Sequence, residues 1–142
     1  MLKLLVAVDG SECSIRLADY VIAQARRCSE PLEVHLLNVQ LPLAGVNVKL
    51  FISREDLEAY YREEGTAALK SPREKLDAAG IKYAFHIGLG NPAEVILQYA
   101  EEKHCEQIAM GTRGLGSVSN LVLGSVASKA IHLAKVPVLL VK

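Results

Sequence analysis

The chain has 142 residues, of which 51% are apolar and 23% are charged. This length and apolar content are typical of one folded domain, over residues 1–142, and argue against an intrinsically disordered chain. Lys and Arg together number 16, as do Asp and Glu, so the net charge of zero gives no general attraction to nucleic acid or to an anionic membrane.

The N-terminal apolar run Leu2–Val8 is too short to span a bilayer. Asp9 and Glu12 follow it and interrupt any signal-peptide pattern. The chain has three cysteines, an odd number, without C-x-x-C spacing. These features favour a cytoplasmic protein without disulfides or a zinc site.

Apolar runs and helical periodicity alternate along the chain. The runs predict five buried strands, at Leu2–Val8, Leu32–Val39, Ile81–Ile87, Glu106–Met110 and Val136–Val141. Helical spacing predicts helices over Ser14–Cys28, from Ser53 to Ala79, from Pro92 to Ala100, and over Val126–Ala134. This alternation predicts a parallel sheet with helices on both faces.

Local signals mark the second of these helices. Ser53 is the expected N-cap, and Gly80 suits the position just after the helix. Pro72 is expected to kink or interrupt the helix, because proline removes a backbone hydrogen bond and clashes with the preceding turn. Residues 40–52, which contain Pro42 and Gly45, are expected to form a flexible connection.

The connection from Met110 to Ala127 is rich in glycine and joins a predicted strand to a predicted helix. Gly124 precedes Ser125, which is the expected N-cap of that helix. The free N–H groups and the positive dipole end of such a helix start form an anion site. The segment is not a Walker A loop, because a Gly-Lys pair does not follow it.

The spacing Gly111-x-x-Gly114, nine residues, then Gly124-Ser125 resembles the ATP-binding motif of the universal stress protein family. The first strand, ending Val6-Ala7-Val8-Asp9-Gly10-Ser11, and the last strand, Pro137–Val141, are also similar to that family. The resemblance covers essentially the whole chain. It implies a Rossmann-like, open, five-stranded α/β sheet with strand order 3-2-1-4-5.

In that strand order, ligands bind beyond the carboxyl ends of strands 1 and 4. The resemblance implies that ATP with Mg²⁺ binds there, with AMP and ADP as alternatives. Adenine would lie near the backbone after Val8 and between Val39 and Met110, while Asp9 would face a ribose hydroxyl or the Mg²⁺. The phosphates would lie on the remaining residues of the implied site, which are Gly111, Arg113, Gly114, Gly124, Ser125 and Val126. Ala127 replaces a hydroxyl residue found in some family members, which removes one phosphate contact.

Other interpretations of these residues stay open. Asp9 is equally suited to capping the first helix, and capping is compatible with ligand binding. Cys13, beside the same helix start, is more typical of a packing residue than of a reactive one. Gly88-x-Gly90-x-x-Ala93 matches a dinucleotide fingerprint formally, but it lies in the wrong βα unit and indicates a tight helix entry. The four histidines fall in four different elements without metal-ligand spacing.

The resemblance implies an ATP-binding protein with a regulatory role in stress response, without catalytic residues. Two alternatives come from other classes. One is a slow Mg-dependent ATPase or nucleotidyl-transfer enzyme that uses Asp9. The other is a dimeric interaction module without nucleotide. A homodimer through Val136–Val141 is expected whichever of these functions holds, because this apolar strand would lie at a sheet edge.

Overall fold

The computed structural model describes residues 1–43, 51–113 and 123–142. Its centre is a five-stranded sheet with the order β3-β2-β1-β4-β5, and each neighbouring pair is parallel. The strands are β1 (Leu2–Ala7), β2 (Leu32–Gln40), β3 (Tyr83–Leu89), β4 (Gln107–Gly111) and β5 (Val138–Val141). The predicted fold class and strand order are therefore confirmed.

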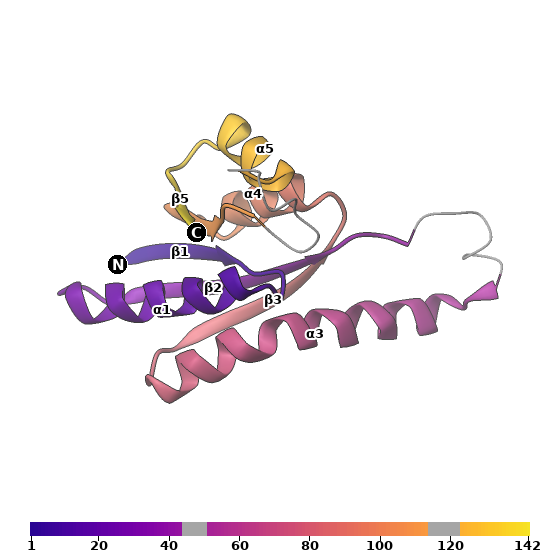
Figure 1. Ribbon diagram of the computed structural model, residues 1–142, viewed down its shortest axis with the longest axis horizontal. Helices are drawn as coiled ribbons and strands as arrows, with labels where there is room; N and C mark the ends of the chain where they lie inside the picture. Colours follow the sequence, from indigo (N-terminus) through magenta and orange to yellow (C-terminus); the bar gives the residue numbers. More distant parts are fainter. Residues whose placement is uncertain (44–50, 114–122) are drawn as a thin grey trace.

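Helices cover both faces of this sheet, as Figure 1 shows with α1 and α3 below it and α4 and α5 above it. These helices are α1 (Glu12–Arg27), α3 (Arg54–Ala78), α4 (Pro92–Glu102) and α5 (Ser125–Leu133). Alternate residues of the strands point into two separate cores. The core on the α1 and α3 side includes Leu4, Val6, Leu17, Val21, Leu36, Leu69 and Leu76. The core on the α4 and α5 side includes Leu5, Leu37, Ile96, Ile108 and Ala130.

The third strand begins two residues later than the sequence predicts, because the end of α3 uses the backbone of Ile81. Gly80 has a φ of +71° and donates from its N–H to the Asp77 carbonyl, while the Ile81 N–H donates to the Leu76 carbonyl. This pair of bonds is a Schellman motif, which satisfies carbonyls left free at a helix end. The prediction that Gly80 follows the helix is confirmed.

Pro72 does not interrupt α3, which runs as one helix of 25 residues. A proline inside a helix costs about 3 kcal/mol. Leu69 and Leu76 flank Pro72 and are completely buried, and each such leucine contributes about 1.5–3 kcal/mol. Pro72 is itself buried. Burial on both sides of the proline therefore offsets its cost and keeps the two halves in one helix.

The start of α3 matches the sequence prediction, because the Ser53 hydroxyl accepts a hydrogen bond from the Asp56 N–H at 3.1 Å. Although α3 is long, its residues are mostly polar. Across the described ranges, no helix combines the length and apolar character needed to cross a membrane.

Two histidines that are 51 residues apart in sequence meet on the α4 side of the sheet. His35 Nδ1 and His86 Nε2 lie 3.1 Å apart, and the two rings stack at a centroid distance of 5.4 Å. The His86 ring also lies against Tyr99 of α4. Burial lowers the pKa of His86, and the neighbouring charges of His35 and Lys103 lower it further.

Acid is expected to destabilise the protein through His86. Its pKa is lower in the folded state than the ordinary value of 6.5, so the unfolded chain binds more protons below that pH. The stability that neutral His86 contributes is fully present above about pH 6.5 and is lost as the pH falls toward the folded pKa.

Urea unfolding from about pH 7.5 to about pH 5.5 should show a smaller loss of stability in His86→Asn than in the wild type. His104→Asn is the control, because His104 is exposed and has a positive φ that asparagine tolerates. An equal acid-induced loss in wild type and His86→Asn would contradict this assignment.

Candidate functional site

A cavity of about 690 Å³ opens beyond the carboxyl ends of β1, β2 and β4. Its volume lies within the range of small-molecule sites, which is about 300–1,000 Å³. The ends of these strands meet the starts of α1 and α5 at this place, where the strand order reverses between β1 and β4. Ligands of open α/β sheets bind at such a reversal.

The cavity brings together most of the residues that the sequence singled out. Those that line it are Val8, Asp9, Val39, Met110, Gly111, Arg113, Gly124, Ser125 and Val126. Gly114 lies outside the described residues. Ala127 and Cys13 also line the cavity, and both are buried. Segments separated by more than a hundred residues thus form one concave surface.

Asp9 holds the turn between β1 and α1. Its Oδ1 accepts hydrogen bonds from the Ser11 N–H at 2.9 Å and from the Ser14 hydroxyl at 3.2 Å. The Asp9 N–H in turn donates to the Ser14 hydroxyl oxygen at 3.0 Å. The N-cap of α1 is Ser11, so Asp9 supports the helix start without capping it. The carboxylate therefore has a structural role in this turn, and it lines the cavity as well.

The backbone at the end of β1 is largely satisfied by the protein itself. The Val8 N–H donates to the Leu37 carbonyl at 2.9 Å, and the Val8 carbonyl accepts from Asn38 Nδ2 at 2.8 Å. Asn38 Oδ1 accepts from Gln40 Nε2 at 2.6 Å. A ligand that reads the backbone of Val8 would therefore meet a carbonyl that already has one donor and keeps one lone pair. Sequence reasoning missed Asn38, although a lone amide within the apolar run of β2 was a signal.

The start of α5 differs by one residue from the prediction. Gly124 is the N-cap and Ser125 is the first helical residue, because the Gly124 carbonyl accepts the first helical bond, from the Ser128 N–H at 3.0 Å. The Gly124 N–H donates to the Thr112 carbonyl, which anchors the helix start to the end of β4. In the described part of the chain, α5 has neither a side-chain cap nor an acidic residue in its first turn. An anion in the cavity would complement these N–H groups.

Gly111 lets the end of β4 approach α1 closely. A Cβ atom at this position would lie 2.9 Å from the Cβ of Cys13 and 3.1 Å from the carbonyl oxygen of Arg113. Both distances are shorter than ordinary contacts of a side chain. The glycine is therefore required by space, since the cavity wall leaves no room for a larger residue.

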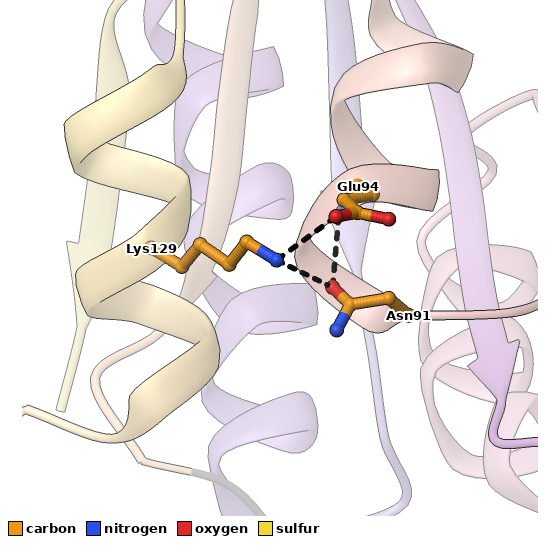
Figure 2. A network of polar contacts seen from close by, with 3 residues as sticks. All are labelled: Asn91, Glu94 and Lys129. Atoms are coloured by element: carbon orange, nitrogen blue, oxygen red, sulfur yellow. Dashed lines mark hydrogen bonds and ion pairs between the residues drawn. The ribbon is translucent and has the colours of Figure 1, made fainter.

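A polar network ties α5 to the start of α4 beside the cavity (Figure 2). Lys129 Nζ lies 3.0 Å from Glu94 Oε1 and 3.5 Å from Asn91 Oδ1. Asn91 also caps α4, because its Oδ1 accepts from the Glu94 N–H at 3.3 Å. Pro92 and Ile96 of α4 line the cavity, so the network holds two walls of the cavity together.

A further wall of the cavity was not predicted at all. It comes from α3 and consists of Tyr60, Glu64, Ala67 and Ala68, which we call the α3 wall. Leu41 and Leu43, which follow β2, also line this side. The helical spacing of the α3 residues is visible in the sequence, but the side of the sheet that α3 covers is not.

Metal ligands are sparse near the cavity. Within the ranges that the structure describes, His, Cys, Asp and Glu side chains do not form a group of three or more that could hold a metal ion. A divalent cation in this cavity would therefore take ligands from a bound nucleotide as well as from the protein, as Mg²⁺ commonly does.

Comparisons with known proteins agree with this architecture. The model of the universal stress protein family matches residues 1–142. Universal stress protein MJ0531 of Methanocaldococcus jannaschii is 33% identical over 141 residues, which cover 99% of this chain and 81% of that protein. The solved structure of protein MJ0577 from the same organism has a TM-score of 0.84 and 29% identity, covering 99% of this chain and 95% of that chain. The structure of the universal stress protein from Archaeoglobus fulgidus in complex with dAMP has a TM-score of 0.71 at 23% identity, covering 100% of this chain and 98% of that chain.

Proposed function

Because this chain belongs to the universal stress protein family, we propose that it binds ATP with Mg²⁺ in the cavity at the carboxyl ends of β1, β2 and β4. The observation that carries the proposal is the convergence of separate segments. The apolar side chains of Val39 and Met110, the carboxylate of Asp9 and the uncapped helix start at Ser125 line one cavity. These are the chemical complements of a base, a ribose or Mg²⁺, and a chain of phosphates.

The phosphate half of the ligand would lie at the α5 side. The N–H groups at the start of α5 are suited to phosphate oxygens, and the Arg113 guanidinium adds a positive charge nearby. Ala127 lacks a hydroxyl, so phosphate binding would depend on backbone N–H groups and on Arg113.

The base half would lie against β2 and β4, between Val39 and Met110. The A. fulgidus relative was solved with dAMP and shares this fold, which supports an adenine nucleotide as the ligand class. As the regulatory role of the family implies, nucleotide binding would change the conformation or the partner choice of the protein. Val136–Val141 would form the interface of a homodimer.

Titration calorimetry tests the proposal by comparing the affinities of ATP, which carries phosphates, and adenosine, which does not. Wild type is expected to bind ATP, and Arg113→Gln should bind it at least about tenfold more weakly, because a charge-assisted contact to phosphate is lost. Binding of adenosine, which has no phosphate, should change little in the same variant. Arg62→Gln is the control, since Arg62 is exposed on α3 and lies outside the cavity. Absence of heat with ATP in the wild type, together with failure to compete with a fluorescent ATP analogue, would refute nucleotide binding.

A further inference from the structure

The α3 wall places four residues on one stripe of a helix. Tyr60, Glu64, Ala67 and Ala68 follow the spacing that puts residues on the same helical face. Ala68 packs closely on the turn after β1, because a Cβ at Gly10 would lie 3.4 Å from Ala68. Glu64 is one helical turn before Ala68, and it is an exposed residue that lines the cavity.

Charge is unevenly distributed over the cavity. Carboxylates belong to the side formed by α1 and α3, where Asp9 and Glu64 line the cavity. Arg113 and the start of α5 belong to the other side, which attracts anions. A nucleotide is itself polarised, with phosphates at one end and a neutral nucleoside at the other. The ribose would therefore lie nearer to α3 than the phosphates do, since the carboxylates repel phosphate.

Glu64 is suited to accept hydrogen bonds from a ligand. Among the described residues, its carboxylate has neither a hydrogen-bond nor an ion-pair partner. Asp9, in contrast, already accepts from the Ser11 N–H and the Ser14 hydroxyl. An ionised carboxylate only accepts hydrogen bonds, and vicinal hydroxyls supply two donors for its two oxygens. In dinucleotide-binding folds an acidic side chain binds ribose in this way.

Tyr60 lies one helical turn before Glu64 in α3 and is the first residue of the α3 wall. Its side chain is 42% exposed although it lines the cavity, so a large part of the ring is available for contact. An aromatic ring gives apolar surface to a sugar or a base. The wall therefore offers a hydrogen-bond acceptor beside an apolar face, which matches the two sides of a ribose ring.

We propose that Glu64 is a specificity residue that accepts hydrogen bonds from the ribose hydroxyls of the bound nucleotide. This inference rests on the proposed nucleotide binding and assigns a role to a helix that the sequence motif does not include. It makes the site selective for ribonucleotides over ligands that carry the same base and phosphates without the hydroxyls.

The test compares ATP with 2′,3′-dideoxy-ATP by titration calorimetry. Wild type should bind ATP about tenfold more tightly, because the dideoxy sugar leaves the carboxylate without its donors. Glu64→Gln should reduce this ratio to about one by weakening ATP binding more than dideoxy-ATP binding. Glu63→Gln is the matched control, because Glu63 is an exposed neighbour on α3 outside the cavity, and it should keep the wild-type ratio.

The other outcomes separate this inference from nucleotide binding itself. If wild type binds both ligands equally, or if Glu64→Gln keeps the wild-type ratio, the ribose role of Glu64 is wrong while nucleotide binding stands. If Glu64→Gln weakens both ligands equally and only with Mg²⁺ present, the carboxylate acts on the metal and the inference is overturned. If wild type binds neither ligand, both proposals fail.

Discussion

A Gly111→Val variant is expected to bind ATP about a hundredfold more weakly than the wild type. The first atom of the new side chain would lie 2.9 Å from the Cβ of Cys13, so β4 and α1 would have to move apart. Overpacking of this kind costs about 1–3 kcal/mol, and each 1.4 kcal/mol corresponds to a tenfold change in affinity. Both segments line the cavity, so the strain acts directly on the binding geometry.

Two further variants separate this steric effect from a general loss of stability. Gly111→Ala should also weaken ATP binding, and the double variant Gly111→Ala with Cys13→Gly should recover part of it, because the second change removes the atom that clashes. Gly80→Ala is the control, since Gly80 has a φ of +71° and its substitution strains the backbone far from the cavity. It should lower stability without changing the affinity for ATP. Calorimetry together with urea unfolding gives both quantities, and wild-type affinity in Gly111→Val would place the site elsewhere.

A Leu140→Asp variant is expected to convert a homodimer into a monomer. β5 lies at one edge of the sheet, and its four residues are all only partly buried within a single chain. Pairing with β5 of a second copy would satisfy the outward backbone groups and cover these apolar side chains. An aspartate there is costly to bury, and the two-fold axis would bring two like charges together. Light scattering after size exclusion measures the change.

The opposite edge of the sheet supplies the control for this experiment. Phe85 lies on β3 and is 45% exposed, so Phe85→Asp changes a comparable apolar residue at an edge that is not expected to pair. It should leave the dimer intact. Circular dichroism must show that Leu140→Asp is folded, because Leu140 also packs against the core on the α5 side. A monomeric wild type at micromolar concentration, or a dimeric Leu140→Asp, would contradict an interface through β5.

The strands were predictable because each is a mostly apolar run, and the central strands β1 and β4 are buried at three consecutive residues each. Their ends were less predictable where hydrogen bonds of neighbouring elements compete for the same backbone. Ile81 is apolar enough for a strand, yet its N–H is used by the end of α3. Ser125 has the side chain of an N-cap, yet Gly124 holds that position, because the Gly124 carbonyl accepts the first helical hydrogen bond and its N–H is bonded to Thr112 of the preceding segment.

The cavity was predictable only in part, for a related reason. Gly111 ends a strand, while Gly124 and Asp9 belong to connections between elements, where residue type shows the local geometry. Glu64 and the histidine pair lie within regular elements, and only the packing of those elements brings them to their neighbours. Pro72 is a similar case in the fold. A proline predicts an interrupted helix, but the burial of Leu69 and Leu76 on either side of it outweighs that local preference.

The buried polar side chain of Asn38, which lines the cavity, has its hydrogen-bond partners within the protein itself. The buried amide of Asn38 donates to Val8 and accepts from Gln40, so emptying the cavity leaves neither end of this group without a partner. An unpaired buried polar group would cost about 1–3 kcal/mol, a large part of the stability of a small domain. The ligand-free chain does not carry this cost at Asn38. The folded state therefore needs no ligand to satisfy this amide, and a bound nucleotide would add its binding free energy to a chain that is already folded.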